Sequence, residues 1–101
     1  MKIKLFCNAG MSTSMLVTKM QAAAKVRGLD VEIIACPQAT ITTESDDCDI
    51  ALLGPQVRFM LNEAKRICEP KGVPVAVINM QDYGLMKGEK VLDDALKMLK
   101  K

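Results

Sequence analysis

The sequence contains no histidine and no tryptophan, and only 3% of its 101 residues are aromatic. Without histidine, the chain cannot form a Ser-His or Cys-His catalytic pair, so any chemistry runs without a histidine base of its own. Nucleic-acid binding is also disfavoured, because the net charge is only +2 and no basic stripe carries aromatic residues for base stacking. The core must be built from aliphatic and methionine side chains.

Long apolar segments are absent as well. No run is long enough to span a bilayer, and the N-terminus lacks the apolar region and cleavage site of a signal peptide. We therefore expect a soluble, cytoplasmic protein. The length suits a single domain, residues 1–101, and the chain is half hydrophobic, which is enough for a core without disulfide bonds.

The cysteines do not form a C-x-x-C pair, which disfavours a thioredoxin-type site. They are Cys7, Cys36, Cys48 and Cys68. A zinc site would need all four thiolates from scattered positions. We therefore expect free thiols, no metal and no cofactor.

Strand-like and helix-like runs alternate along the chain. The predicted strands span residues 2–6, 30–35, 49–54 and 73–79, and the predicted helices span 14–27, 56–69 and 89–99. Residues 38–49 and 80–88 are predicted as loops, the first with one short helical turn. Such alternation gives right-handed β-α-β units around a parallel sheet.

The order of the strands follows from their composition. The first and third strands look the most buried, which places them centrally, and Pro74 near the start of the fourth favours an edge position. We predict an α/β fold in three layers: a four-stranded parallel sheet of order 2-1-3-4 with helices on both faces.

Cys7 stands at the carboxyl end of the first predicted strand, where ligands bind in such folds. The loop and helix start that follow offer backbone amides, three hydroxyls and a glycine, which together suit an anion. The first acidic residue is Asp30, so this environment favours the thiolate, the nucleophilic form of cysteine. We predict that Cys7 accepts a phosphoryl group. The predicted phosphate-binding residues are Asn8, Ala9, Gly10, Met11, Ser12, Thr13 and Ser14.

Three alternatives to a phosphoryl carrier stay open at this point. Cys7 can be a small buried side chain that ends a strand, or part of a module that binds anions without using the thiol. A small cysteine phosphatase is the third, but its C-x5-R loop holds phosphate with an arginine, and here that position is Thr13. Without the arginine, hydrolysis of a phosphocysteine should be slow. The other three cysteines are interpreted as structural.

The stretches CNAGMSTSMLV, LLGPQVRFML and DYG together resemble the lactose/cellobiose-type enzyme IIB family of the bacterial phosphoenolpyruvate-dependent sugar phosphotransferase system. The similarity covers essentially the whole chain. It implies a four-stranded parallel sheet and a phosphotransferase with a phosphocysteine at Cys7. The phosphoryl group would come from a phosphohistidine of a IIA protein. It would pass to a sugar of the cellobiose, lactose or chitobiose class, held by the membrane-embedded IIC component at the inner face of the membrane. One difference is Asn8, where many members have a smaller residue.

The other matching segments follow the third and fourth strands, at the same edge of the sheet as Cys7. We predict Pro55, Gln56 and Tyr83 as partner contacts, and Gln56 also as a possible donor to phosphate. The alternatives are that Pro55 and Gln56 only start a helix and that Tyr83 only packs. A phosphatase-like general acid at Asp82 is the weaker interpretation, because the arginine is missing.

Overall fold

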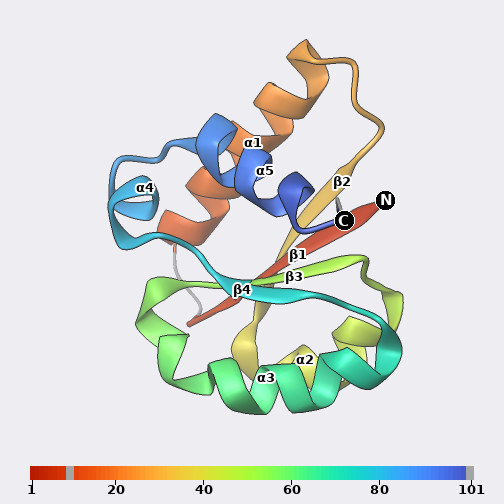
Figure 1. Ribbon diagram of the computed structural model, residues 1–101. Coiled ribbons are helices and arrows are strands. Elements are labelled where there is room, and N and C mark those ends of the chain that lie inside the picture. The colour runs from red at the N-terminus through yellow and green to blue at the C-terminus, as the bar shows by residue number, and fades with distance from the viewer. Residues whose placement is uncertain (9–10, 100–101) are drawn as a thin grey trace.

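The computed structural model describes residues 1–8 and 11–99, and its strands form one parallel sheet in the order β2-β1-β3-β4 (Figure 1). The strands are β1 (Lys2–Cys7), β2 (Glu32–Pro37), β3 (Ile50–Leu53) and β4 (Val75–Val77). The predicted strand order is confirmed, including the edge position of β4. The carboxyl ends of β1 and β3 lie side by side, since Phe6 pairs with Leu53.

Helices cover both faces of the sheet, which confirms the three-layer prediction. One face is covered by α1 (Met11–Val26) and α5 (Gly88–Lys97), and the other by α2 (Ile41–Glu44) and α3 (Leu61–Cys68) (Figure 1). No helix in the described ranges is long and apolar enough to cross a membrane.

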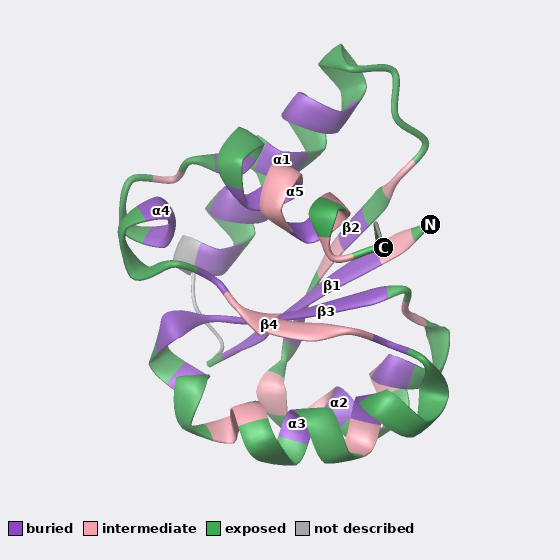
Figure 2. Ribbon diagram, viewed as in Figure 1, coloured by how far each residue is buried: buried purple, intermediate pink, exposed green. Residues whose placement is uncertain are grey.

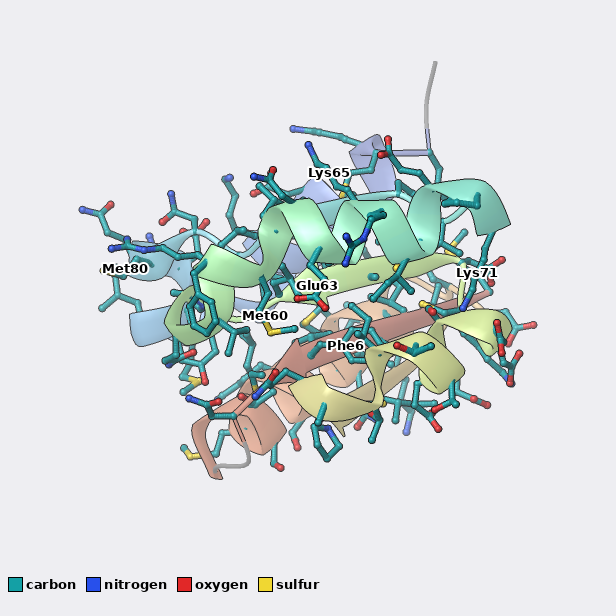
Figure 3. All side chains as sticks on the ribbon, turned by 90° about the horizontal axis from the view of Figure 1, so that it is seen from below. Phe6, Met60, Glu63, Lys65, Lys71 and Met80 are labelled. Carbon is teal, nitrogen blue, oxygen red and sulfur yellow. The ribbon has the colours of Figure 1, made fainter. Side chains whose placement is uncertain are left out.

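The side chains of β1 alternate between two cores. Ile3 and Leu5 belong to the cluster that includes α1 and α5, whereas Phe6 belongs to the cluster that includes α3 (Figure 3). The central strands β1 and β3 are almost entirely buried, and β4 is intermediate (Figure 2). By the same alternation, Cys7 lies on the α1 side of the sheet.

Several element boundaries differ from the prediction: β2 begins and ends two residues later, and β4 is shorter at both ends. Helix α1 begins at Met11, three residues before the predicted start at Ser14, so Thr13 lies in the helix and not in the loop before it. Residues 38–49 form three short helical pieces: the 3-10 helices η1 (Gln38–Thr40) and η2 (Ser45–Asp47) on either side of α2. The helix predicted over 56–69 is divided.

That division lies within the first part of the segment. The 3-10 helix η3 (Pro55–Met60) contains a non-helical Val57 with φ −117°, and α3 follows it. Another 3-10 helix, η4 (Glu69–Lys71), then leads to Gly72, whose φ of +75° ends the segment in a conformation that suits glycine.

Candidate active site

The Cys7 sulfur lies at the carboxyl end of β1, in contact with the first turn of α1. Its side chain is only 4% exposed. The thiol donates to the Asn8 carbonyl oxygen over 3.0 Å, and the Thr13 Oγ1 lies 2.5 Å from Sγ. The strand and the helix that follows it thus bring a hydroxyl group directly against the sulfur.

A second hydroxyl stands behind the first. The Tyr83 hydroxyl lies 2.8 Å from Thr13 Oγ1, although the two residues are 70 positions apart in the sequence. Thr13 is 3% exposed and Tyr83 is 8% exposed, so both groups are buried beside Cys7. The result is a continuous row of polar atoms from Tyr83 through Thr13 to the cysteine sulfur.

The helix α4 (Met80–Gly84) holds Tyr83 in place. This helix lies in the stretch predicted as a loop, so that prediction is wrong. The cause is Asn79, whose side-chain oxygen accepts from the backbone amides of Gln81 and Asp82 and so caps the helix start. An Asn followed by an aliphatic–polar stretch is the sequence signal that would have indicated this helix.

The carboxyl group of Asp82 points to a different partner. Its Oδ2 lies 3.8 Å from the Lys90 ammonium group on α5. The structure thus pairs the acid with a lysine, and no interaction of its side chain with Cys7 is described.

The residue after β3, Gly54, packs directly against the cysteine. Its backbone amide donates to the Phe6 carbonyl over 2.9 Å. A Cβ atom on Gly54 would lie 2.8 Å from the Cys7 Cβ and 2.9 Å from Gln56 Oε1, closer than real Cβ contacts allow. A side chain at this position would therefore collide with the cysteine that it borders.

The predicted phosphate-binding residues fall into three groups. Thr13 is buried on the sulfur, whereas the side chains of Asn8 and Ser14 are exposed. Ala9 and Gly10 lie outside the described residues, as do the side chains of Met11 and Ser12. A phosphate-binding role for these residues stays a prediction.

The predicted partner contacts differ in accessibility. Gln56 is exposed, whereas Pro55 and Tyr83 are buried in the isolated chain. A partner can therefore reach the Gln56 side chain without any rearrangement, while the Tyr83 hydroxyl faces inward to Thr13. Contact with a partner stays a prediction for all three.

The remaining cysteines are free thiols in settings that favour the protonated form. Burial raises the pKa of Cys36, and the nearby Glu44 carboxylate raises it further. Burial raises the pKa of Cys48 to about 11 and also raises the pKa of Cys68. No group of three or more metal-binding side chains gathers among residues 1–8 and 11–99.

Comparison with known proteins identifies the family. The family model described as "PTS system, Lactose/Cellobiose specific IIB subunit" matches residues 2–94. The chain belongs to this family. It is 54% identical over 95 residues to the galactose-specific EIIB component of Lactococcus lactis subsp. cremoris. The match covers 89% of this chain and 88% of the relative.

Two further relatives agree with this assignment. The cellobiose-specific EIIB component of Lactococcus lactis subsp. lactis is also 54% identical, with the same coverage of both chains. The solution structure of a cellobiose-specific phosphotransferase IIB component from Borrelia burgdorferi is 43% identical. It superimposes on this chain with a TM-score of 0.79, and the match covers 96% of this chain and 89% of the Borrelia burgdorferi chain.

In this IIB component, Thr13 occupies the position that an arginine occupies in the loop of a cysteine phosphatase. The guanidinium group of arginine donates two parallel, charged hydrogen bonds to a phosphate. A threonine can donate only one neutral bond, and the Thr13 hydroxyl lies against the sulfur. Among the described residues, the side chains in contact with Cys7 therefore supply a neutral hydroxyl group and no guanidinium group.

Proposed function

We propose that this IIB component carries a phosphoryl group on Cys7, which it accepts from a phosphohistidine of a IIA protein and passes to a sugar held by a membrane IIC protein. The observation that supports this most strongly is the Thr13 hydroxyl on the Cys7 sulfur, at the strand end where an α/β fold binds its ligands. The proposal adds the covalent step and the partners to what the family name states.

The transfer follows from the chemistry of a thiolate. The thiol proton is released to solvent, and a sulfur lone pair of Cys7 attacks phosphorus. The S–P bond forms as the P–N bond breaks, and the electron pair of that bond returns to the imidazole nitrogen of the donor. In the second transfer, a sugar hydroxyl attacks phosphorus, the S–P bond breaks and the electron pair returns to the sulfur. No histidine exists in this chain to take the hydroxyl proton, so the IIC side supplies the base.

Exposed apolar side chains at the same edge support docking of partner proteins there. Met15 on α1, Phe59 on η3 and Met80 on α4 are each more than half exposed, and Leu85 follows α4 directly. All of these elements follow the carboxyl ends of strands, as Cys7 does. A cluster of this kind on a small protein marks an interaction surface.

The names of the relatives indicate that the sugar is chosen elsewhere. Two relatives with the same 54% identity carry a galactose-specific and a cellobiose-specific name. We therefore assign the choice of sugar to the IIC partner and place this IIB component in the cytoplasm, at the inner face of the membrane during transfer.

Phosphorylation with a phosphorylated IIA protein, followed by intact-mass and peptide-mass measurement, tests the proposal. The wild-type chain should gain one phosphoryl group, located on Cys7, and Cys7→Ser should gain none because it lacks the thiolate. The matched controls Cys36→Ser, Cys48→Ser and Cys68→Ser should each accept the group at close to the wild-type rate. Comparable phosphorylation of Cys7→Ser would refute the proposal.

A further inference from the structure

We infer that Tyr83 is a positioning residue for Cys7: its hydroxyl fixes the direction in which Thr13 donates a hydrogen bond to the sulfur. The inference rests on the proposed function for its meaning in phosphoryl transfer. Its geometric basis is the row Tyr83–Thr13–Cys7–Asn8, in which each neighbouring pair lies within hydrogen-bonding distance.

Which group donates in each hydrogen bond of this row follows from the number of protons that each group carries. The Asn8 carbonyl only accepts, so the Cys7 thiol donates to it. The sulfur therefore accepts in its second contact, and the Thr13 hydroxyl is the donor. A threonine hydroxyl has a single proton, so Thr13 Oγ1 accepts from the Tyr83 hydroxyl, which donates.

Donation from Tyr83 to Thr13 and from Thr13 to the sulfur suits the thiolate as well as the thiol, whereas the Asn8 carbonyl loses its bond when the thiol proton leaves. When the thiol proton leaves, the Thr13 proton already points at the sulfur and the Tyr83 proton at Thr13. Neither hydroxyl has to turn, so the donors are in place before the charge forms. Donation by Tyr83 also polarises the Thr13 hydroxyl and strengthens its bond to the thiolate.

The burial of Tyr83 distinguishes a positioning role for this residue from a direct contact with a partner protein. The Tyr83 side chain is 8% exposed and its hydroxyl lies against Thr13. Removal of the hydroxyl should therefore change how fast Cys7 reacts and leave the binding of the IIA protein as it is. A partner contact would show the opposite pattern.

The experiment uses Tyr83→Phe, Thr13→Val and the double variant. The first readout is the rate at which iodoacetamide alkylates Cys7 in the native chain at pH 7, measured by peptide mass without any phosphate. The second is phosphoryl uptake from a phosphorylated IIA protein, separated into kcat and KM. Thr13→Ser keeps a hydroxyl at the same position, and Ser45→Ala removes a buried hydroxyl on the other side of the sheet.

The two hydroxyls should act as one unit. Loss of a hydrogen bond to a charged group costs about tenfold to a hundredfold in rate. We expect Tyr83→Phe to slow alkylation and kcat about tenfold with KM unchanged. Thr13→Val should slow both about a hundredfold. In the Thr13→Val background, Tyr83→Phe should have no further effect, because its action passes through Thr13. Thr13→Ser, which restores a hydroxyl, should recover most of the rate that Thr13→Val loses, and Ser45→Ala should stay within about threefold of the wild type.

Three results would overturn the inference: unchanged rates in Tyr83→Phe, an increase in KM alone, or an equal loss from Tyr83→Phe with and without the Thr13 hydroxyl. If the wild-type chain accepts no phosphoryl group, the proposed function fails. The alkylation readout then still decides whether Tyr83 acts on Cys7 through Thr13.

Discussion

Cys7, the proposed phosphoryl acceptor, and Cys48 lie at opposite edges of the sheet and have different surroundings. Cys7 ends β1, and a hydroxyl donates to its sulfur. Cys48 stands before β3, at the amino edge, and its thiol donates to the Ile50 carbonyl over 2.9 Å. Burial raises the pKa of Cys48 to about 11. Burial accounts for the raised pKa of Cys48, and the Cys7 sulfur differs from the Cys48 sulfur in having the Thr13 hydroxyl beside it.

The two edges also differ in charge. At the amino edge, Lys2 pairs with Asp47, and the Lys71 ammonium group lies 2.7 Å from Asp46. Figure 3 shows Lys71 and Met80 at opposite ends of the molecule, and Met80 belongs to the carboxyl edge. The charges of the amino edge are thus satisfied within the chain.

The immediate surroundings of Cys7 at the carboxyl edge are uncharged instead. The polar groups described around Cys7 are hydroxyls and backbone atoms. Neutral donors can receive a phosphoryl group without first breaking an ion pair. The two ion pairs thus lie at the amino edge, and the proposed phosphate site lies at the other edge.

The substitution with the largest expected effect on phosphoryl uptake fills the space beside Cys7. Gly54→Ala adds a Cβ only 2.8 Å from the Cys7 Cβ, so the cysteine or the end of β3 has to shift. We expect phosphoryl uptake to fall more than about tenfold, because small displacements of reacting groups are costly, and stability to fall by about 1–3 kcal/mol.

Gly84→Ala is the matched control for this substitution. It lies on α4 at the same edge, and a Cβ there would meet nothing within 4 Å. Uptake should stay near the wild-type value, with stability measured by denaturant unfolding unchanged or slightly higher. Equal behaviour of the two alanine variants would contradict the claimed close packing at Gly54.

A smaller effect concerns the amino-edge thiol. Burial in the folded chain raises the pKa of Cys48 from an ordinary value of 9.0 to about 11, so the unfolded chain releases this proton at lower pH. The free energy of unfolding should therefore keep its full value below about pH 9 and fall as the pH rises from there toward 11. By pH 10 the loss should be about 1 kcal/mol.

Cys48→Ala provides the control, because it removes the titrating group. Denaturant unfolding of both proteins at pH 8, 9 and 10 should show the wild type losing more stability than the variant with each step. Parallel pH profiles would show that the Cys48 thiol does not titrate abnormally in the fold.

Much of this architecture was predictable from local patterns. Alternating runs predicted the parallel sheet, the apolar first and third strands predicted the order 2-1-3-4, and Pro74 predicted the edge position of β4. The helix α4 was missed because the loop interpretation gave no weight to Asn79 as a helix cap. The division of the segment after β3 was missed because its apolar spacing continues through the non-helical Val57.

The candidate site was predictable only in part. Position at the end of β1 indicated Cys7, and the phosphatase motif drew attention to Thr13. The contact between Thr13 and Tyr83 joins residues from distant parts of the chain, and no local pattern carries such information. The same holds for the approach of Gly54 to Cys7, which depends on how β3 lies beside β1.

The lifetime of the phosphorylated chain in buffer tests the central claim most directly. The chain is phosphorylated, the IIA donor is removed, and the intact mass is followed with time, with and without the IIC protein and sugar. With Thr13 in place of an arginine, attack by water lacks a stabilising donor worth about 3–4 kcal/mol, or roughly a hundredfold to a thousandfold in rate. We predict that the phosphocysteine persists in buffer and is lost rapidly when IIC and sugar are added. Rapid loss in buffer alone would contradict the carrier account and favour a phosphatase.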